Sequence, residues 1–119
     1  MKKELQTISV KQLEGGIFVI GFKDMVIASD SAIEKLGEEL LSLECTQRVV
    51  VNFQGVSLFS SEAIGKLLEF AKKREPNFET KLPLCSLSDD VQNSFATKHL
   101  DVKFFELFSS LEDVIQWYN

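Results

Sequence analysis

Two serines and a glutamate stand side by side where an apolar stretch of the sequence gives way to a helical pattern. In the segment LFSSEAIG, residues 58–65, these are Ser60, Ser61 and Glu62. A serine at a helix start can cap the backbone N–H groups of the first turn, accept a phosphoryl group or, beside a base, act as a nucleophile. The rest of the sequence decides which of these roles it supports.

Nucleophilic and cofactor-dependent chemistry finds little support elsewhere in the chain. The single histidine, His99, falls near the end of a different predicted helix, whereas a serine nucleophile needs the imidazole beside it. No G-x-S-x-G elbow surrounds either serine, and neither a Walker loop nor a G-x-G-x-x-G motif occurs. No His/Cys cluster with metal-ligand spacing is present. The sequence therefore predicts a protein that is not an enzyme and has no cofactor and no metal.

The composition predicts one globular domain over residues 1–119. The chain is 45% hydrophobic and 26% charged, and its formal net charge is -5. That charge argues against nucleic acid and anionic membranes as partners, because both are bound through Lys and Arg. No apolar stretch approaches the roughly 20 residues of a membrane span, and MKKELQTISV lacks the apolar region of a signal peptide. Cys45 and Cys85 are too few for a disulfide framework, so we expect a cytoplasmic protein with free thiols, Cys85 being buried.

Hydrophobic runs bounded by turn residues predict five strands. RVVVNF (48–53) is β-branched and uninterrupted, which is typical of a strand buried on both faces. Gly15 and Gly16 separate the first two runs and predict a hairpin. Pro83 indicates that its strand starts irregularly or lies at an edge. The predicted strands cover residues 5–10, 17–22, 48–53, 81–87 and 102–108.

Four helices are expected between and after these strands. The S-x-x-E pairs Ser31/Glu34 and Ser109/Glu112 predict capping boxes at the starts of the first and last helices, and Pro76 is expected to stop the second. The first helix should bury one apolar face, made of Ile33, Leu36, Leu40 and Leu41. The helices are predicted over 31–44, over about 61–74, from 88 to about 100 with Val91, Phe95 and Leu100 inward, and after 109 with Leu111, Val114, Ile115 and Tyr118 inward.

The resulting fold class is α/β, with the order β-β-α-β-α-β-α-β-α. It predicts a mixed, mainly parallel sheet of four to five strands with an N-terminal β-hairpin, covered by about four helices. Because right-handed crossovers place all strand-to-helix junctions on one edge of a parallel sheet, the polar residues of these junctions should form a rim. They are Asp24, Ser29, Asp30, Ser60, Ser61, Glu62, Ser88, Asp89 and Asp90.

This rim is rich in hydroxyls and carboxylates and lacks glycines and cations. It would therefore bind a phosphorylated ligand poorly, but it could meet a protein partner, and one of its hydroxyls could itself be phosphorylated.

The order of elements, together with VVVNFQGVSLFSSEAIGKLL, resembles the STAS domain, the fold shared by anti-sigma factor antagonists and sulfate transporter tails. The resemblance covers essentially the whole chain. Its most diagnostic piece is a buried strand, a short Gly-Val connection and a turn reading roughly Asp-Ser-Ser-Gly-Leu-Gly. The family's Asp falls on Ser60 and its phosphorylated serine on Ser61, while Gly65 matches, Ile64 is conservative and Glu62 and Ala63 differ.

The resemblance implies a bacterial, cytoplasmic signalling module in transcription regulation. It would bind a serine-kinase-type anti-sigma factor and be switched by phosphorylation of Ser61, with Ser60 as the second choice. Two alternatives stay open: a non-phosphorylated STAS scaffold or sensor-associated subunit, in which Glu62 supplies permanent charge, and a small-molecule binder that uses the apolar space beneath the rim. The expected partner-binding residues are Asp24, Ser29, Asp30, Ser60, Ser61, Glu62, Ile64, Ser88 and Asp89.

Overall fold

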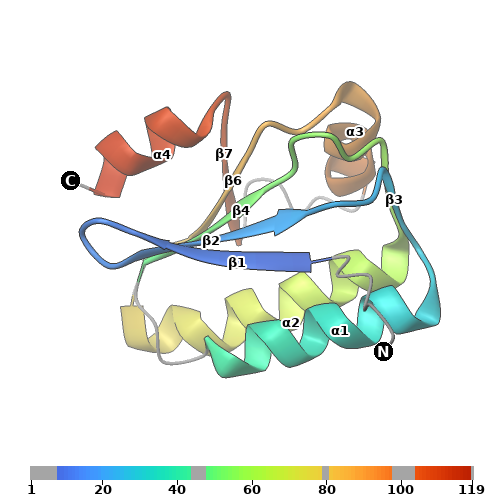
Figure 1. Cartoon of the computed structure of the whole chain (residues 1–119), viewed down its shortest axis with the longest axis horizontal. Helices are drawn as coiled ribbons and strands as arrows, with labels where there is room; N and C mark the ends of the chain where they lie inside the picture. Colours follow the sequence, from blue (N-terminus) through green and yellow to red (C-terminus); the bar gives the residue numbers. More distant parts are fainter. Residues whose placement is uncertain (1–7, 44–47, 79–80, 98–103, 119) are drawn as a thin grey trace, which may run out of the picture.

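Figure 1 shows the computed structural model of the chain, which describes residues 8–43, 48–78, 81–97 and 104–118. The predicted order of strands and helices is confirmed, and two short strands, β3 and β5, are added to it. Cys45, His99 and Leu100 lie outside the described residues. The elements are β1 (Ile8–Leu13), β2 (Ile17–Phe22), β3 (Val26–Ile27), α1 (Asp30–Ser42), β4 (Val49–Asn52), β5 (Leu58–Phe59), α2 (Ser61–Phe78), β6 (Leu82–Cys85), α3 (Asp89–Thr97), β7 (Phe105–Phe108) and α4 (Leu111–Tyr118).

A five-stranded sheet in the order β1-β2-β4-β6-β7 forms the middle layer. β1 and β2 make the predicted antiparallel hairpin, with Leu13 opposite Ile17, and the remaining strands run parallel to β2. β4 is the central strand, and its three valines, Val49, Val50 and Val51, are 0% exposed. The uninterrupted β-branched run therefore marks a strand buried on both faces, as predicted.

The described helices divide unequally between the two faces of the sheet. Figure 1 shows α1 and α2 side by side on one side of the sheet and α4 on the opposite side. Each crossover from β2 to β4, β6 and β7 moves one strand along the sheet in the same direction, so right-handed connections place α1, α2 and α3 on one face. Their apolar sides share one large core, which includes Leu36, Leu67 and Phe95. α4 packs on the opposite face, where Val114 meets Val50 in a smaller cluster.

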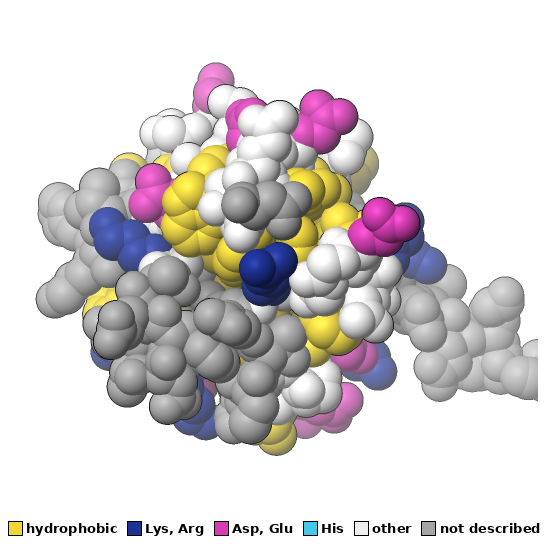
Figure 2. Space-filling view, turned by 90° about the vertical axis from the view of Figure 1, so that its left-hand side faces the viewer, with side chains coloured by type: hydrophobic (Ala, Val, Ile, Leu, Met, Phe, Trp, Pro, Cys, Tyr) yellow, Lys and Arg dark blue, Asp and Glu magenta, His cyan; other side chains and the backbone are white. Residues whose placement is uncertain are grey.

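α4 is fastened to the start of the central strand. The hydroxyl of Tyr118 donates to the carbonyl of Val49 (2.8 Å) and accepts from the N–H of the same residue (3.2 Å). Trp117 lies 5.4 Å from the Phe108 ring, centroid to centroid, and is 42% exposed. Figure 2 shows this end of the molecule, where hydrophobic side chains gather near the centre of the face. The rim of strand-to-helix junctions lies at the other end.

The two predicted capping boxes are wrong by small shifts. α1 is capped by Ser29, whose Oγ accepts from the N–H of Ala32 at 3.2 Å, and Ser31 lies inside the first turn. α4 is capped by Ser110, which accepts from the N–H of Asp113 at 3.3 Å, and not by Ser109. Several serines in a row satisfy the same sequence pattern, so backbone geometry decides which of them reaches the N–H groups.

Two other local expectations also fail, and a third holds only in part. Leu41 is 62% exposed, because it points about 100° away from Leu40 around α1 and so leaves the face that meets the sheet. α2 continues past Pro76 to Phe78, since a proline removes one backbone bond but keeps a helical φ. Pro83 does not mark an edge, because β6 lies between β4 and β7. The start of β6 is irregular on the side of β4, since its register with β4 begins only at Leu84, whereas its register with β7 begins at Leu82.

Burial makes Cys85 a structural residue. The side chain is 0% exposed in the cluster beneath α4, and burial raises the pKa of the thiol from 9.0 to about 11, an effect that a hydrogen bond with Ser86 partly opposes. A thiol that stays protonated at neutral pH is a poor nucleophile.

We predict that Val50→Asp destabilises the protein by several kcal/mol, because it places an unpaired carboxylate in a site with no exposed surface. The same substitution at Val26, which is 52% exposed, is the matched control and should change the free energy of unfolding by less than about 0.5 kcal/mol. Urea denaturation of both variants measures the difference. Equal stabilities would show that β4 is not the central buried strand.

We predict that stability falls at alkaline pH because of Cys85. The unfolded thiol loses its proton first, near its pKa of 9.0, whereas the folded thiol keeps its proton up to about 11. The unfolded state therefore binds fewer protons in this window, and the free energy of unfolding should drop by about 2–3 kcal/mol across it. Urea denaturation of wild type and Cys85→Ala at several pH values separates this drop from other titrations. Parallel pH profiles for the two proteins would contradict the assignment.

Candidate functional site

The strand-to-helix junctions gather at one end of the molecule, where Figure 1 shows the N-termini of α1 and α2 beside β3, with α3 above them. The structure joins the first two junctions directly through a second, two-stranded parallel sheet of β3 and β5. The third junction reaches them through α3, whose Phe95 packs against Phe59 with 6.3 Å between ring centroids. The predicted rim thus exists as one end of the fold.

The β3–β5 pair was not predicted, because two residues are too few to show an alternating pattern. Its register places Val26 beside Leu58 and Ile27 beside Phe59. Backbone hydrogen bonds continue on both sides of it, from the N–H of Ser57 to the carbonyl of Met25 (2.7 Å) and from the N–H of Ser60 to the carbonyl of Ile27 (3.0 Å). This ladder holds the backbone that leads into α2.

The side chains of the ladder alternate between the core and the surface. Ile27 is 0% and Phe59 3% exposed, and the Phe59 ring lies 4.9 Å from that of Phe53. Val26 and Leu58 point outward, with 52% and 49% of their surface exposed, and Met25 beside them is 65% exposed. We call Met25, Val26 and Leu58 the apolar rim patch. Met25 and Val26 lie far from Leu58 in the sequence, so no local pattern predicts that these side chains meet.

Ser60 is the N-cap of α2. Its Oγ accepts a hydrogen bond from the N–H of Ala63 at 3.1 Å, and its carbonyl accepts from the N–H of Ile64 at 2.9 Å. With its own N–H bonded to Ile27, this half-buried residue is committed to holding the start of the helix.

Two other rim serines are used in the same way. Ser29 caps α1, and Ser88 caps α3 by accepting from the N–H of Val91 at 3.3 Å. Both oxygens satisfy N–H groups that would otherwise lack a partner in the first turn. These hydroxyls therefore position the three helices around the rim.

Ser61 is different from the capping serines. It is the first residue of α2, is exposed, and its hydroxyl makes no hydrogen bond to any residue in the described part of the chain. Glu62 next to it is also exposed and lies in the first turn of α2. The hydroxyl of Ser61 thus faces solvent at the positive end of a helix dipole.

The remaining expected partner-binding residues divide by exposure. Asp24, Asp30 and Asp89 are exposed on the rim. Ile64 is 1% exposed and packs in the main core, so it positions α2 from inside.

The space beneath the rim is filled by aromatic side chains. Phe53 stacks on Phe22 at 5.4 Å and meets Phe95 edge-on at 5.9 Å between ring centroids. In the described part of the chain, no group of three or more His, Cys, Asp or Glu side chains is arranged to hold a metal ion. None of the described helices is both long and apolar enough to cross a bilayer.

The structure is similar to several solved structures, although no family model and no curated protein matches the chain. A STAS domain protein from Planctomyces limnophilus, described as an anti-sigma-factor antagonist, matches with a TM-score of 0.76 at 20% identity over 94% of this chain and 98% of that chain. The Bacillus cell fate determinant SpoIIAA in its phosphorylated form matches with a TM-score of 0.71 at 16% identity, over 94% and 99% of the two chains. The unphosphorylated form of SpoIIAA matches with a TM-score of 0.76 at 16% identity, over 93% and 95%. At these identities the matches establish the fold, and the resemblance to STAS domains is confirmed at that level.

We predict that the two adjacent serines differ in their effect on stability. Ser60→Ala removes the cap of α2 and should cost about 1 kcal/mol, or about 4 °C in melting temperature. Ser61→Ala is the matched control, because it removes an unbonded surface hydroxyl and should melt within about 1 °C of wild type. Thermal melts followed by circular dichroism make the comparison. A larger loss for Ser61→Ala would show that the roles of the two serines are reversed.

Proposed function

We propose that this chain is a cytoplasmic, non-enzymatic regulator of the anti-anti-sigma type, which binds a serine-kinase-type anti-sigma factor through the rim and is released when Ser61 is phosphorylated. The observation that carries the proposal is that the rim serines differ in hydrogen bonding and exposure. Ser29, Ser60 and Ser88 are engaged as caps, while Ser61 presents an exposed hydroxyl. A kinase can reach that hydroxyl without disturbing the fold.

The fold supports this proposal through its neighbours. Both the phosphorylated and the unphosphorylated forms of SpoIIAA have the fold of this chain. A domain of this architecture therefore keeps its structure when it carries a phosphate, as a reversible switch requires.

The local electrostatics indicate that the domain tolerates a phosphate on Ser61, whereas a docked partner would not. A phosphoserine brings about -1.5 to -2 charges at pH 7. At Ser61 this charge meets the N–H groups and positive dipole of the α2 N-terminus, which offset repulsion from Glu62. A partner packed on the same rim would have to desolvate it.

The apolar rim patch indicates what that partner covers. Met25, Val26 and Leu58 are large hydrophobic residues with about half or more of their surface exposed, at the edge of the rim that carries Ser61. Burying them would supply hydrophobic free energy, and a phosphate at the border of the buried patch would oppose docking. Met25, Val26 and Leu58 therefore join Asp24, Asp30, Ser61, Glu62 and Asp89 in the proposed surface.

A non-phosphorylated STAS scaffold is the second candidate, and the exposed Glu62 favours it. Its carboxylate places a permanent negative charge one residue from Ser61. In that case the surface would be the same but would not be switched. A small-molecule binder loses support, because the phenylalanine rings occupy the space beneath the rim.

We predict that Ser61→Asp weakens partner binding about a hundredfold and leaves the melting temperature unchanged or slightly raised. Ser61→Asn has the same shape without the charge, so it is the matched control and should bind within about threefold of wild type. Calorimetric titration with a serine-kinase-type anti-sigma factor from the same organism measures both variants, and mass spectrometry after incubation with that kinase-like protein and ATP locates the phosphate.

Three outcomes would contradict the proposal. Equal affinity of wild type and Ser61→Asp would show that charge at this position does not control binding. A phosphate on Ser60 would show that Ser61 is not the phosphorylated residue. Binding of the kinase-like protein without any phosphorylation would favour the scaffold.

A further inference from the structure

A groove runs between α1 and α2 on the outside of the molecule. Two adjoining cavities of about 320 and 410 Å³ share Glu34, Lys66 and Glu69 as lining residues, so they form one continuous depression, the α1–α2 groove. It extends from Asp30 and Glu62, in the first turns of the two helices, to Leu41 and Lys73 further along. The rise of α1 from Asp30 to Leu41 makes it about 16 Å long, or three helical turns.

The groove is strongly acidic. Two lysines, Lys66 and Lys73, face a larger number of carboxylates. In the part of the chain that the structure describes, none of these carboxylates forms an ion pair. The carboxylates are Asp30, Glu34, Glu38, Glu62 and Glu69.

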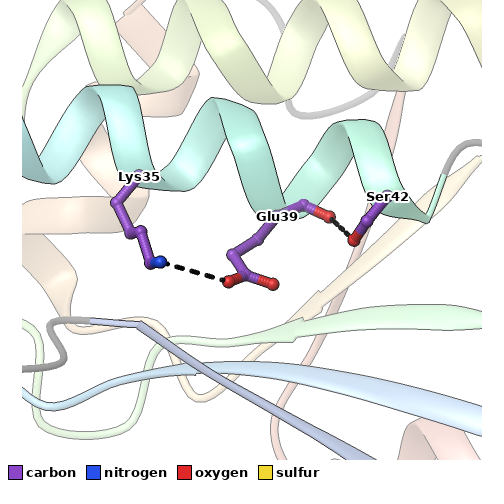
Figure 3. Close-up of polar contacts among 3 residues, drawn as sticks. All are labelled: Lys35, Glu39 and Ser42. Carbon is purple, nitrogen blue, oxygen red and sulfur yellow. Dashed lines mark hydrogen bonds and ion pairs between the residues drawn. The ribbon is translucent and has the colours of Figure 1, made fainter.

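The nearest lysine of α1 does not neutralise the groove. Figure 3 shows that Lys35 and Glu39 project from the side of α1 that is turned away from α2, where their charged groups are 3.8 Å apart. Lys35 therefore pairs within its own face of the helix, and the excess negative charge stays on the groove side.

The floor of the groove is apolar and its wall carries an exposed leucine. Ile33, Leu40 and Phe70 line the floor with 7%, 3% and 4% of their surface exposed. Leu41, expected from sequence in the core, stands at the wall with 62% exposed. The space beside Gly65 is open, since a Cβ at this position would meet no atom within 4 Å.

We propose that the α1–α2 groove binds a basic amphipathic segment of a protein partner, with lysines or arginines of the segment on the groove carboxylates and its apolar side chains against Leu41 and the floor. The length of three turns and the combination of an apolar floor with acidic walls match a short helix better than a small cation. A second copy of this chain is a poor occupant, because its net charge of -5 repels the acidic walls. The inference does not depend on phosphorylation of Ser61.

The test uses a defined probe. A 15N-labelled sample of the whole chain is titrated with an amidated helical peptide of about four turns, which carries leucines on one side and lysines on the flanks. Amide shifts should map to residues 30–41 and 62–73 and weaken at high salt. The same peptide with glutamate in place of every lysine should not bind.

Matched variants separate groove binding from general attraction to an acidic protein. Glu34→Gln/Glu38→Gln removes two groove carboxylates and should weaken the peptide about fivefold or more, as should Leu41→Ser. Glu112→Gln/Asp113→Asn removes two exposed charges from α4 and should change the affinity less than about twofold. All these side chains are exposed, so we expect each variant to fold as wild type does. The spectrum of each free variant checks this directly.

Several results would overturn the proposal. These are absence of binding by the basic peptide, shifts spread over the whole surface, equal weakening by the α4 control variant, or binding of the acidic peptide. Groove shifts that depend on protein concentration without peptide would show that a second copy is the occupant.

Discussion

The pairing of β3 with β5 is the constraint on which the candidate site depends. Only four residues form this ladder, yet it joins two loops that are more than thirty residues apart and fixes the backbone on both sides of it. The N–H of Ser60 bonds to the carbonyl of Ile27, so the cap of α2 and the Ser61 that follows are both placed by β3. Without this pair, the start of α2 would lose one of its backbone contacts, and Met25, Val26 and Leu58 would not form one surface.

Aromatic packing supports this small ladder. An isolated two-stranded pair of this length is not stable in water, so it needs support from the core. Phe59 supplies that support, because its ring meets Phe22, Phe53 and Phe95 within 6.3 Å between centroids. The rim therefore combines a packed base of phenylalanines with an outer layer of exposed hydroxyl, carboxylate and apolar groups.

The rim and the α1–α2 groove meet at Asp30 and Glu62 but differ in physical character. The rim offers exposed apolar side chains, whereas the groove offers an excess of negative charge over an apolar floor. Charge of this kind acts at longer range and mainly speeds association and selects a basic partner. A phosphate on Ser61 would add to the negative charge at this meeting point, so its effect on a partner depends on which of the two surfaces that partner uses.

Local patterns were sufficient to predict most of the fold. Which face of a helix or strand is buried is recorded in the sequence of that segment itself. Examples are the β-branched run 48–53 and the apolar spacing around Leu36, Leu67 and Phe95. The hairpin, the parallel sheet, the helix order and the gathering of hydroxyls and carboxylates at strand-to-helix junctions follow from the same patterns. The resemblance to STAS domains, which the solved structures confirm for the fold, rests on the order of elements and on the segment around Ser61.

Contacts between distant segments were decided only by the tertiary structure. Ser29 and Ser31, or Ser60 and Ser61, are equivalent in a sequence pattern, and only the path of the backbone determines which oxygen reaches an N–H of the first turn and which does not. Three other features likewise have no local sequence pattern, because each depends on how two elements are placed against one another. They are the ladder between Ile27 and Phe59, the apolar rim patch and the exposure of Leu41. Periodicity records the burial of a single helix or strand, whereas a site between elements is created by their packing.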